Sequence, residues 1–113
     1  MTDNCLFCKI SQGQIPAAKI YEDADIMAFH DISPQAPLHF LVIPKKHLSG
    51  PAAISEADQA LIGKVMAMGA TLAKEQGHDD FRFVVNNGAG AGQTVFHFHL
   101  HVLGGRPMTW PPG

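Results

Sequence analysis

The tightest constraint on the fold is an alternation of histidine with apolar residues over His97-Phe98-His99-Leu100-His101. Successive side chains of a β-strand point to opposite faces, so the pattern predicts a strand, which we extend over residues 94–103. One face would carry the three imidazoles. The other would pack on a helix through Phe96, Phe98, Leu100 and Val102. Imidazole titrates near neutral pH and serves as nucleophile, base or metal ligand, so this strand is the first candidate site.

A long helix is predicted between Ser55 and Gly77. Ser55 with Asp58 resembles a capping box, and a glycine at position 77 is a typical C-terminal stop. Between them, apolar residues recur at helical spacing and give one apolar face. That face is formed by Leu61, Val65, Met68 and Leu72, together with Ile54 just before Ser55.

The remaining elements are short. They are a helix at 6–10, strands at 18–22 and 26–30 that form a hairpin, and strands at 38–43 and 81–86. Two prolines exclude regular structure from residues 31–37. Strands joined by short turns on one side of a long helix predict an α+β fold with an antiparallel sheet.

Length and charge narrow the class of function. A chain of 113 residues is long enough for one core, and we expect a single domain over residues 1–113. Its net charge is −2, whereas a protein that coats nucleic acid normally has an excess of basic residues. No apolar run approaches the ~20 residues of a membrane helix. The N-terminal residues do not resemble an export signal, so we expect a cytoplasmic location and no membrane partner.

Two cysteines stand three positions apart, as Cys5-x-x-Cys8. In a chain without an export signal, this spacing favours a metal site or a redox pair over a structural disulfide. Zinc usually takes four thiolate or imidazole ligands, and the chain has seven histidines to complete such a set. Two reduced, inert cysteines are the plain alternative. A thioredoxin-like role is disfavoured because no βαβ pattern surrounds the pair.

A glycine-rich segment, residues 87–94, directly precedes the histidine strand. Glycines let a backbone approach an anion closely and direct N–H groups toward it. The segment is not a Walker loop, because no Gly-Lys-Ser/Thr follows, nor a dinucleotide fingerprint, because it enters a strand. By itself it would be read as a flexible hairpin loop. Its place beside the histidines makes it a candidate phosphate cradle.

Together these motifs resemble the histidine triad (HIT) superfamily. Residues 97–103 are similar to its signature, and residues 29–37, 42–47 and 104–113 resemble its histidine triad nucleotide-binding (Hint) branch. The resemblance covers nearly the whole chain. It implies a five-stranded antiparallel sheet with one long helix and a short N-terminal helix, and a homodimer with a continuous ten-stranded sheet. It also implies hydrolysis of purine nucleoside 5′-phosphoramidates such as AMP–amine conjugates to a nucleoside monophosphate (AMP or GMP) and an amine. Aminoacyl adenylates, which carry a mixed anhydride in place of the P–N bond, are a further candidate substrate class.

The resemblance assigns a catalytic role to four residues. His99 would be the nucleophile that forms a nucleotidyl-histidine intermediate, and His101 would bind a phosphate oxygen and stabilise transition-state charge. His39 would support them. Thr94 stands where the family commonly has Ser and would keep the hydroxyl. The residues implied to bind the phosphoryl end are Asn86, Gly92, Gln93 and Thr94, with His99 and His101.

The same resemblance implies a nucleoside pocket. Asp31 would accept hydrogen bonds from the ribose hydroxyls, and His30 would contribute backbone contacts. The apolar walls around the base would be Phe7, Ile10, Phe29 and Ile32. Without the resemblance, ordinary core positions would be the better interpretation of these four residues, and His39 would fit a satisfied buried imidazole.

Some Hint relatives bind zinc, and their matching ligands here are Cys5, Cys8, His47 and His97. Two thiolates and two imidazoles would close the coordination shell, which implies one structural Zn²⁺ per chain and none needed for the chemistry.

The C-terminal tail, residues 108–113, resembles the Hint tail that reaches the partner subunit. Trp110 would pack at the dimer interface and shape the pocket for the leaving group. Pro107 and Thr109 stand where the family often has Gln and His, which removes polar contacts to that group.

Two other functions stay open. One is a dinucleoside polyphosphate hydrolase of the sister branch, which shares the triad. The other is a nucleotide-binding regulatory module with incidental activity. The tail favours the phosphoramidase over the first, and the complete triad argues against the second.

Overall fold

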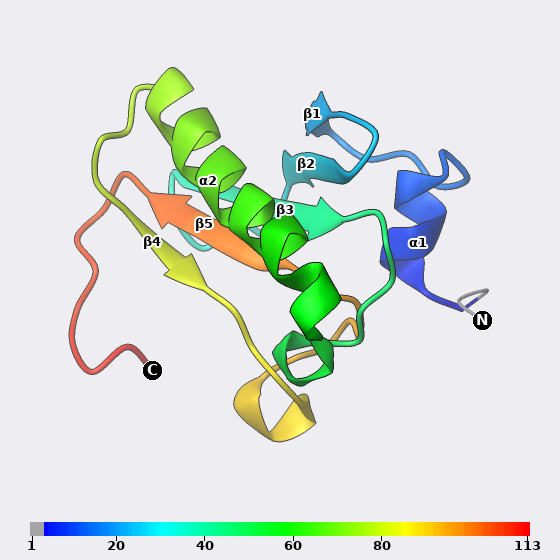
Figure 1. Cartoon of the computed structure of the whole chain (residues 1–113). Helices are drawn as coiled ribbons and strands as arrows, with labels where there is room; N and C mark the ends of the chain where they lie inside the picture. The colour runs from blue at the N-terminus through cyan, green and yellow to red at the C-terminus, as the bar shows by residue number, and fades with distance from the viewer. Residues whose placement is uncertain (1–3) are drawn as a thin grey trace.

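The computed structural model describes residues 4–113 as one antiparallel sheet with a helix on each side (Figure 1). The elements are α1 (Leu6–Ser11), β1 (Lys19–Glu22), β2 (Ile26–His30), β3 (Leu38–Pro44), α2 (Gln59–Glu75), β4 (Phe81–Val84) and β5 (Leu100–Gly104). Short 3-10 turns lie at Pro51–Ala53, Glu56–Asp58 and Ala89–Ala91. The predicted α+β fold, with a five-stranded antiparallel sheet, a long helix and a short N-terminal helix, is confirmed.

The strand order is β1-β2-β3-β5-β4, and all neighbours are antiparallel. β3 and β5 are central, with His39 opposite Leu103 and Leu41 opposite His101. This register places His39 and His101 on the same face of the sheet. β1 and β4 are the two edges.

The two faces of the sheet carry separate apolar clusters. On one face, α2 packs on the alternate residues of β3 and β5, and the buried cluster includes Phe40, Leu100 and Val102. A Cβ at Gly69 would lie only 3.2 Å from Leu100 Cδ2, so the absence of a side chain there lets the helix approach the sheet. On the other face, α1 covers a smaller cluster that includes Phe7 and Leu41. His39 and His101 lie on this second face.

The ends of α2 follow the predicted signals. The Asp58 carboxylate accepts hydrogen bonds from Ser55 N at 3.0 Å and from Ser55 Oγ at 2.9 Å. The capping box therefore closes a 3-10 turn, and the α-helix itself begins one turn later than expected, at Gln59. Gly77 has φ +89°, a backbone conformation that favours glycine, and it ends the helix as predicted.

The prediction of a strand from residue 94 is wrong in its first half, because β5 begins only at Leu100. The backbone before it bonds elsewhere: Phe98 N donates to Leu48 O at 2.6 Å, and His97 O accepts from a side chain. Phe96 is consequently not packed on α2 but is 50% exposed. The strand that contains Phe81 is likewise shorter than expected and ends at Val84.

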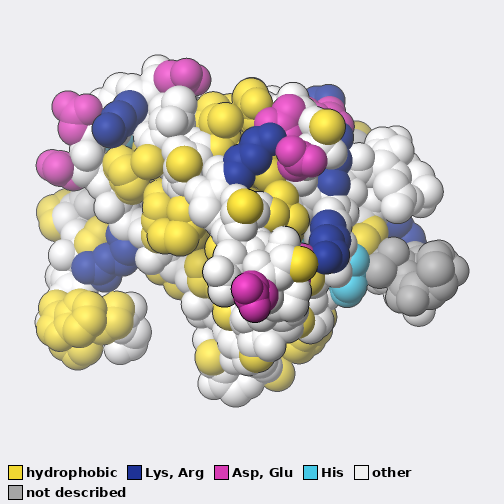
Figure 2. Space-filling model, viewed as in Figure 1, with side chains coloured by type: hydrophobic (Ala, Val, Ile, Leu, Met, Phe, Trp, Pro, Cys, Tyr) yellow, Lys and Arg dark blue, Asp and Glu magenta, His cyan; other side chains and the backbone are white. Residues whose placement is uncertain are grey.

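Among the described residues, no helix is both long and apolar enough to span a bilayer. The residues after β5 extend away from the sheet, and Figure 2 shows their hydrophobic side chains protruding from the body of the molecule. Trp110, in this tail, is 82% exposed.

Candidate functional site

Two cysteines and two histidines from three parts of the chain converge in one cluster. Cys5 caps α1 and Cys8 lies inside it, while His47 follows β3 and His97 precedes β5. His97 Nδ1 lies 3.3 Å from Cys5 Sγ, 3.4 Å from Cys8 Sγ and 3.2 Å from His47 Nδ1. All four ligand atoms lie within 4.8 Å of one another. The sequence prediction that these four residues come together is confirmed.

The donor set and its spacing fit a metal ion. Bonds of ~2.3 Å to sulfur and ~2.0 Å to nitrogen at tetrahedral angles separate ligand atoms by about 3.3–3.8 Å, close to the distances seen here. His97 Nε2 donates to Pro44 O at 2.7 Å, so the Nδ1 lone pair is the one that faces the thiols. Burial lowers the pKa of His97 to about 4, which keeps the ring neutral for coordination. The cluster is therefore close enough, and of the right chemistry, to bind a metal.

His99 is a buried imidazole with its tautomer fixed by the backbone. Its Nδ1 donates to His97 O at 2.7 Å, so Nε2 carries the lone pair. Phe7 packs edge-on against the ring, with centroids 5.1 Å apart, and the His101 ring lies 4.9 Å away. Burial lowers the pKa of His99, against an opposing contribution from its hydrogen bond to His97. A neutral imidazole with a free nitrogen lone pair is the reactive form of a histidine nucleophile.

His39 and His101 form a second fixed pair. Gln35 N donates to His39 Nδ1 at 2.9 Å, so the His39 proton is on Nε2. That Nε2–H lies 3.0 Å from His101 Nδ1 and donates to it, which leaves His101 with its proton on Nε2. Burial lowers the pKa of His39 and lowers that of His101 to about 4. His101 thus presents a neutral N–H donor.

Asp31 lies beside this pair. Its Oδ2 is 3.5 Å from His39 Nε2 and 4.0 Å from His101 Nδ1. Its Oδ1 accepts from Ser33 N at 2.7 Å, which orients the carboxylate. These three groups are near enough together to hold a cation, but the hydrogen bond from Gln35 fixes them as donor and acceptor partners instead.

The glycine-rich segment forms a tight loop braced by Gln93. The Gln93 side chain accepts from Gly88 N at 2.7 Å and donates to Ser49 O at 2.6 Å and to Val95 O at 3.1 Å. The oxygen and the nitrogen of its side-chain amide are thus hydrogen-bonded within the protein. Gly88 and Gly92 have φ of +93° and +97°, which the turn requires. A Cβ at Gly92 would lie 3.8 Å from Asn86 Nδ2, so these two predicted phosphoryl-end residues are neighbours.

The residues predicted to surround the base divide into two groups. Phe7, Ile10 and Phe29 lie in the cluster beneath α1, each less than a tenth exposed. Ile32 is 99% exposed at the start of the irregular loop, and His30 is exposed just before it. Thr94 is exposed at the end of the glycine loop. Trp110 lies in the tail beyond β5 and is exposed.

Several positions in the site were missed from the sequence. Gln35 and Pro44 act through backbone atoms, for which side-chain type carries no signal. Asn87 accepts from Ala52 N at 2.8 Å and ties the glycine loop to the 3-10 turn after β3. An Asn-Gly pair before a glycine run is a turn signal that would have singled out Asn87.

The comparisons with known proteins agree with this geometry. The family model of the HIT domain matches residues 12–108. The chain belongs to the HIT domain family. It is 51% identical over 114 residues to an uncharacterized HIT-like protein of Synechocystis, over the full length of both. It is 47% identical over 103 residues to the protein HitA of Neisseria gonorrhoeae, covering 90% of this chain and 96% of HitA.

Solved structures of HIT proteins have the same fold. A HIT family hydrolase from Legionella pneumophila Philadelphia 1 superposes with a TM-score of 0.95 at 50% identity, over 97% of this chain and 100% of the other. A histidine triad protein from Clostridium difficile gives a TM-score of 0.91 at 39% identity, over 95% of each chain.

Proposed function

We propose that this HIT protein is a nucleoside phosphoramidase, which hydrolyses purine nucleoside 5′-phosphoramidates to a nucleoside monophosphate and an amine. The observation that supports it most is the fixed tautomer of His99, whose Nε2 lone pair is free to attack while its Nδ1 is held by His97 O at 2.7 Å. The Legionella relative described as a HIT family hydrolase supports the same reaction class.

The reaction proceeds in two displacement steps at phosphorus. His99 Nε2 attacks the α-phosphorus, a new P–N bond forms to the imidazole, and the P–N bond to the amine breaks as the amine nitrogen gains a proton. Water then attacks the same phosphorus, the bond to His99 breaks, and the monophosphate leaves with a water-derived oxygen. The proton that this water releases replaces the one taken up by the amine. Covalent catalysis of this kind replaces one difficult displacement with two easier ones.

Neighbouring groups stabilise the charge that develops on phosphorus. The Nε2–H of His101 donates to a non-bridging phosphate oxygen. The N–H groups of Ala91, Gly92 and Gln93 are bonded within the glycine loop, so the further donors are the backbone N–H and hydroxyl of Thr94. Asn86 holds the phosphoryl end. The ribose hydroxyls donate to Asp31, and the base lies between Ile32 and the cluster of Phe7, Ile10 and Phe29. The Thr94 hydroxyl also serves as the proton donor for the leaving nitrogen.

The metal of the Cys5, Cys8, His47 and His97 cluster is proposed to be zinc. Two thiolates and two imidazoles are the ligand set of closed structural zinc sites, and a closed site leaves no position for substrate. These residues join α1, the end of β3 and the segment before β5, so the ion would hold Phe7 against His99. Thiolate ligands require reduced cysteines, which suits the cytoplasm.

The active form is proposed to be a homodimer joined along β4. This strand is an edge of the sheet and pairs only with β5 in the described chain, so its outer backbone groups are available for a second copy. Arg82 on β4 donates to Thr109 O at 3.0 Å and so holds the tail at the same edge. Trp110 is then exposed where a partner would bury it. Sedimentation equilibrium would give twice the monomer mass, and a monomer at micromolar concentration would overturn this part.

The function is tested by steady-state kinetics on three substrates: adenosine 5′-phosphoramidate, an AMP–lysine conjugate and a diadenosine polyphosphate. We expect kcat/KM to be highest for the two P–N substrates. Preference for the polyphosphate would identify a dinucleoside polyphosphate hydrolase instead. Tight AMP binding with turnover of none of the three would identify a nucleotide-binding module.

A further inference from the structure

Arg106, two residues after the end of β5, reaches back to the loop that contacts His39. Arg106 Nε donates to Gln35 O at 2.9 Å, and Gln35 N donates to His39 Nδ1 at 2.9 Å. Gln35 is therefore held at both of its backbone polar atoms, on one side by the arginine and on the other by the histidine. We infer that Arg106 is a positioning residue, which fixes the tautomers of His39 and His101 through the backbone of Gln35.

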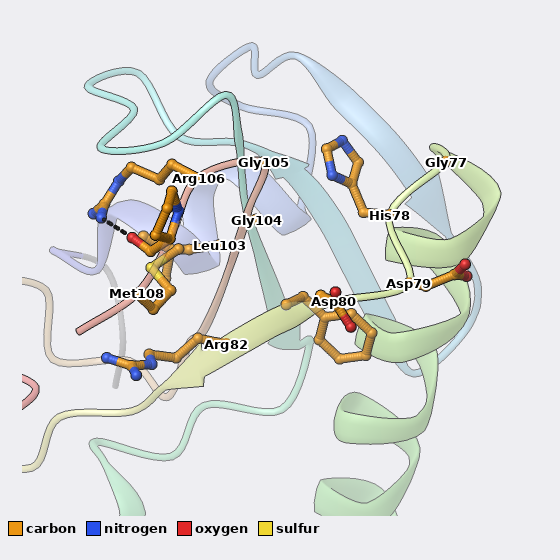
Figure 3. Close-up of a pocket in the computed structure, with 12 residues that line it drawn as sticks. Gly77, His78, Asp79, Asp80, Arg82, Leu103, Gly104, Gly105, Arg106 and Met108 are labelled. Atoms are coloured by element: carbon orange, nitrogen blue, oxygen red, sulfur yellow. Dashed lines mark hydrogen bonds between the residues drawn. The ribbon is translucent and has the colours of Figure 1, made fainter. Parts of the chain in front are cut away.

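The loop that carries Gln35 is packed closely on the chain around Arg106. Gly105 has φ +88°, and a Cβ on it would lie 2.9 Å from Pro37 Cβ. Pro37 is two residues beyond Gln35, so the glycine brings the loop and the residue after it together. Arg106 also donates from Nη1 to Pro107 O at 3.1 Å (Figure 3), which orients its guanidinium.

The Gln35 N–H matters because the His39–His101 pair has two neutral arrangements. With the proton of His39 on Nε2, His101 accepts at Nδ1 and presents Nε2–H to the phosphate. With the proton of His39 on Nδ1, His101 must donate from its own Nδ1, and its Nε2 lone pair would then face a phosphate oxygen. The second arrangement repels the substrate. A backbone donor opposite His39 Nδ1 permits only the first.

A second arginine provides a matched control. Arg82 also lies beside the C-terminal segment in the cavity of about 590 Å³ that contains Arg106 (Figure 3). It donates to Thr109 O at 3.0 Å and has no hydrogen bond to the Gln35 loop. Arg82→Met removes an arginine hydrogen bond to the tail and leaves the hydrogen bonds from Arg106 through Gln35 to His39 unchanged.

The role of Arg106 in the chemistry rests on the proposed function, but its effect on the histidines does not. Long-range ¹H–¹⁵N correlation spectra of the free protein report the tautomer of each imidazole directly. We expect His39 and His101 to be Nε2–H in the wild type and in Arg82→Met. In Arg106→Met a second population with the His39 proton on Nδ1 should appear. Arg106→Lys keeps the charge but lacks the Nε donor, so it should behave as Arg106→Met does.

Kinetics on the AMP–lysine conjugate give the second readout. Because one solvent-exposed hydrogen bond is lost and the second arrangement repels the substrate, we expect kcat/KM in Arg106→Met to fall about fivefold. Gln35→Pro removes the N–H itself and should shift the tautomers further. Wild-type tautomers in Arg106→Met would overturn the inference, and a shift in Gln35→Pro alone would show that the Gln35 N–H acts without Arg106. If the wild type turns over no phosphoramidate, the proposed function fails, while the spectra still decide the role of Arg106.

Discussion

The contact between Gly105 and Pro37 offers a sharp test of how the catalytic loop is held. Gly105 has φ +88°, and a Cβ there would lie 2.9 Å from Pro37 Cβ and 3.2 Å from both Pro37 Cγ and His78 Cε1. Gly77 has nearly the same φ, +89°, but a Cβ on it would meet no atom within 4 Å. The two Gly→Ala variants therefore share a backbone penalty and differ only in the clash.

The expected magnitudes follow from these distances. Alanine in the left-handed region costs ~1–2 kcal/mol, so Gly77→Ala should lower the free energy of unfolding by about that amount. Overpacking adds ~1–3 kcal/mol, because Pro37 is a ring fixed to the backbone and cannot turn away. Gly105→Ala should therefore lose roughly 3 kcal/mol in total. The loop with Asp31 must also shift, so kcat/KM should fall by about tenfold or more.

Urea denaturation measures the first quantity and steady-state kinetics the second. At an m-value of ~2 kcal/mol/M, the two midpoints should differ by roughly 1 M. Gly77→Ala should keep kcat/KM within about twofold of wild type, since it lies at the end of α2. Equal midpoints for the two variants, or full activity in Gly105→Ala, would refute a loop held by close packing.

Four further predictions concern the histidines, the metal cluster and the tail. His99→Ala should fold and bind AMP but lose turnover by several orders of magnitude; activity within about tenfold of wild type would contradict a nucleophile there. Wild-type protein purified without chelator should contain about one zinc by elemental analysis, and replacing Cys5 and Cys8 with Ser should remove it and lower the Tm more than the chemical step; zinc-free, reduced wild type would contradict this. Burial lowers the pKa of His101 from 6.5 to about 4, so the unfolded chain takes up the proton first. Its contribution to stability, roughly 3 kcal/mol, is present above pH 6.5 and lost as the pH falls to about 4, and His101→Asn should flatten that part of the profile. Deleting residues 108–113 should change the ratio of kcat/KM between two amine conjugates more than it changes AMP affinity, and an unchanged ratio would exclude the tail from substrate choice.

The fold could be predicted from local patterns where one physical signal dominates. The apolar face with Val65 and Leu72, the capping box at Ser55 and the glycine at position 77 all describe α2 correctly. The start of β5 could not be predicted in this way. The alternation through His97 is continuous, but Phe98 N bonds to Leu48 O, a long-range partner that no local pattern reveals.

The site was predictable to the extent that side-chain type carries its chemistry. The thiol and imidazole side chains predicted the cluster of Cys5, Cys8, His47 and His97, and the structure brings those four residues together. The tautomers of His39, His99 and His101 could not be predicted, because backbone atoms of Gln35 and His97 set them. The sequence likewise does not decide whether Phe7 belongs to the core or to the wall of the base pocket, because a buried residue of α1 that contacts His99 can serve both roles.

The most direct test of covalent catalysis is to trap the nucleotide on the protein. The enzyme would be mixed with an AMP–lysine conjugate, quenched within milliseconds into base, where phosphorus–imidazole bonds survive, and digested for mass spectrometry. We expect a single AMP adduct on His99, formed as fast as the first turnover and absent in His99→Ala. Turnover without an adduct, or an adduct on His101 or another residue, would contradict the mechanism.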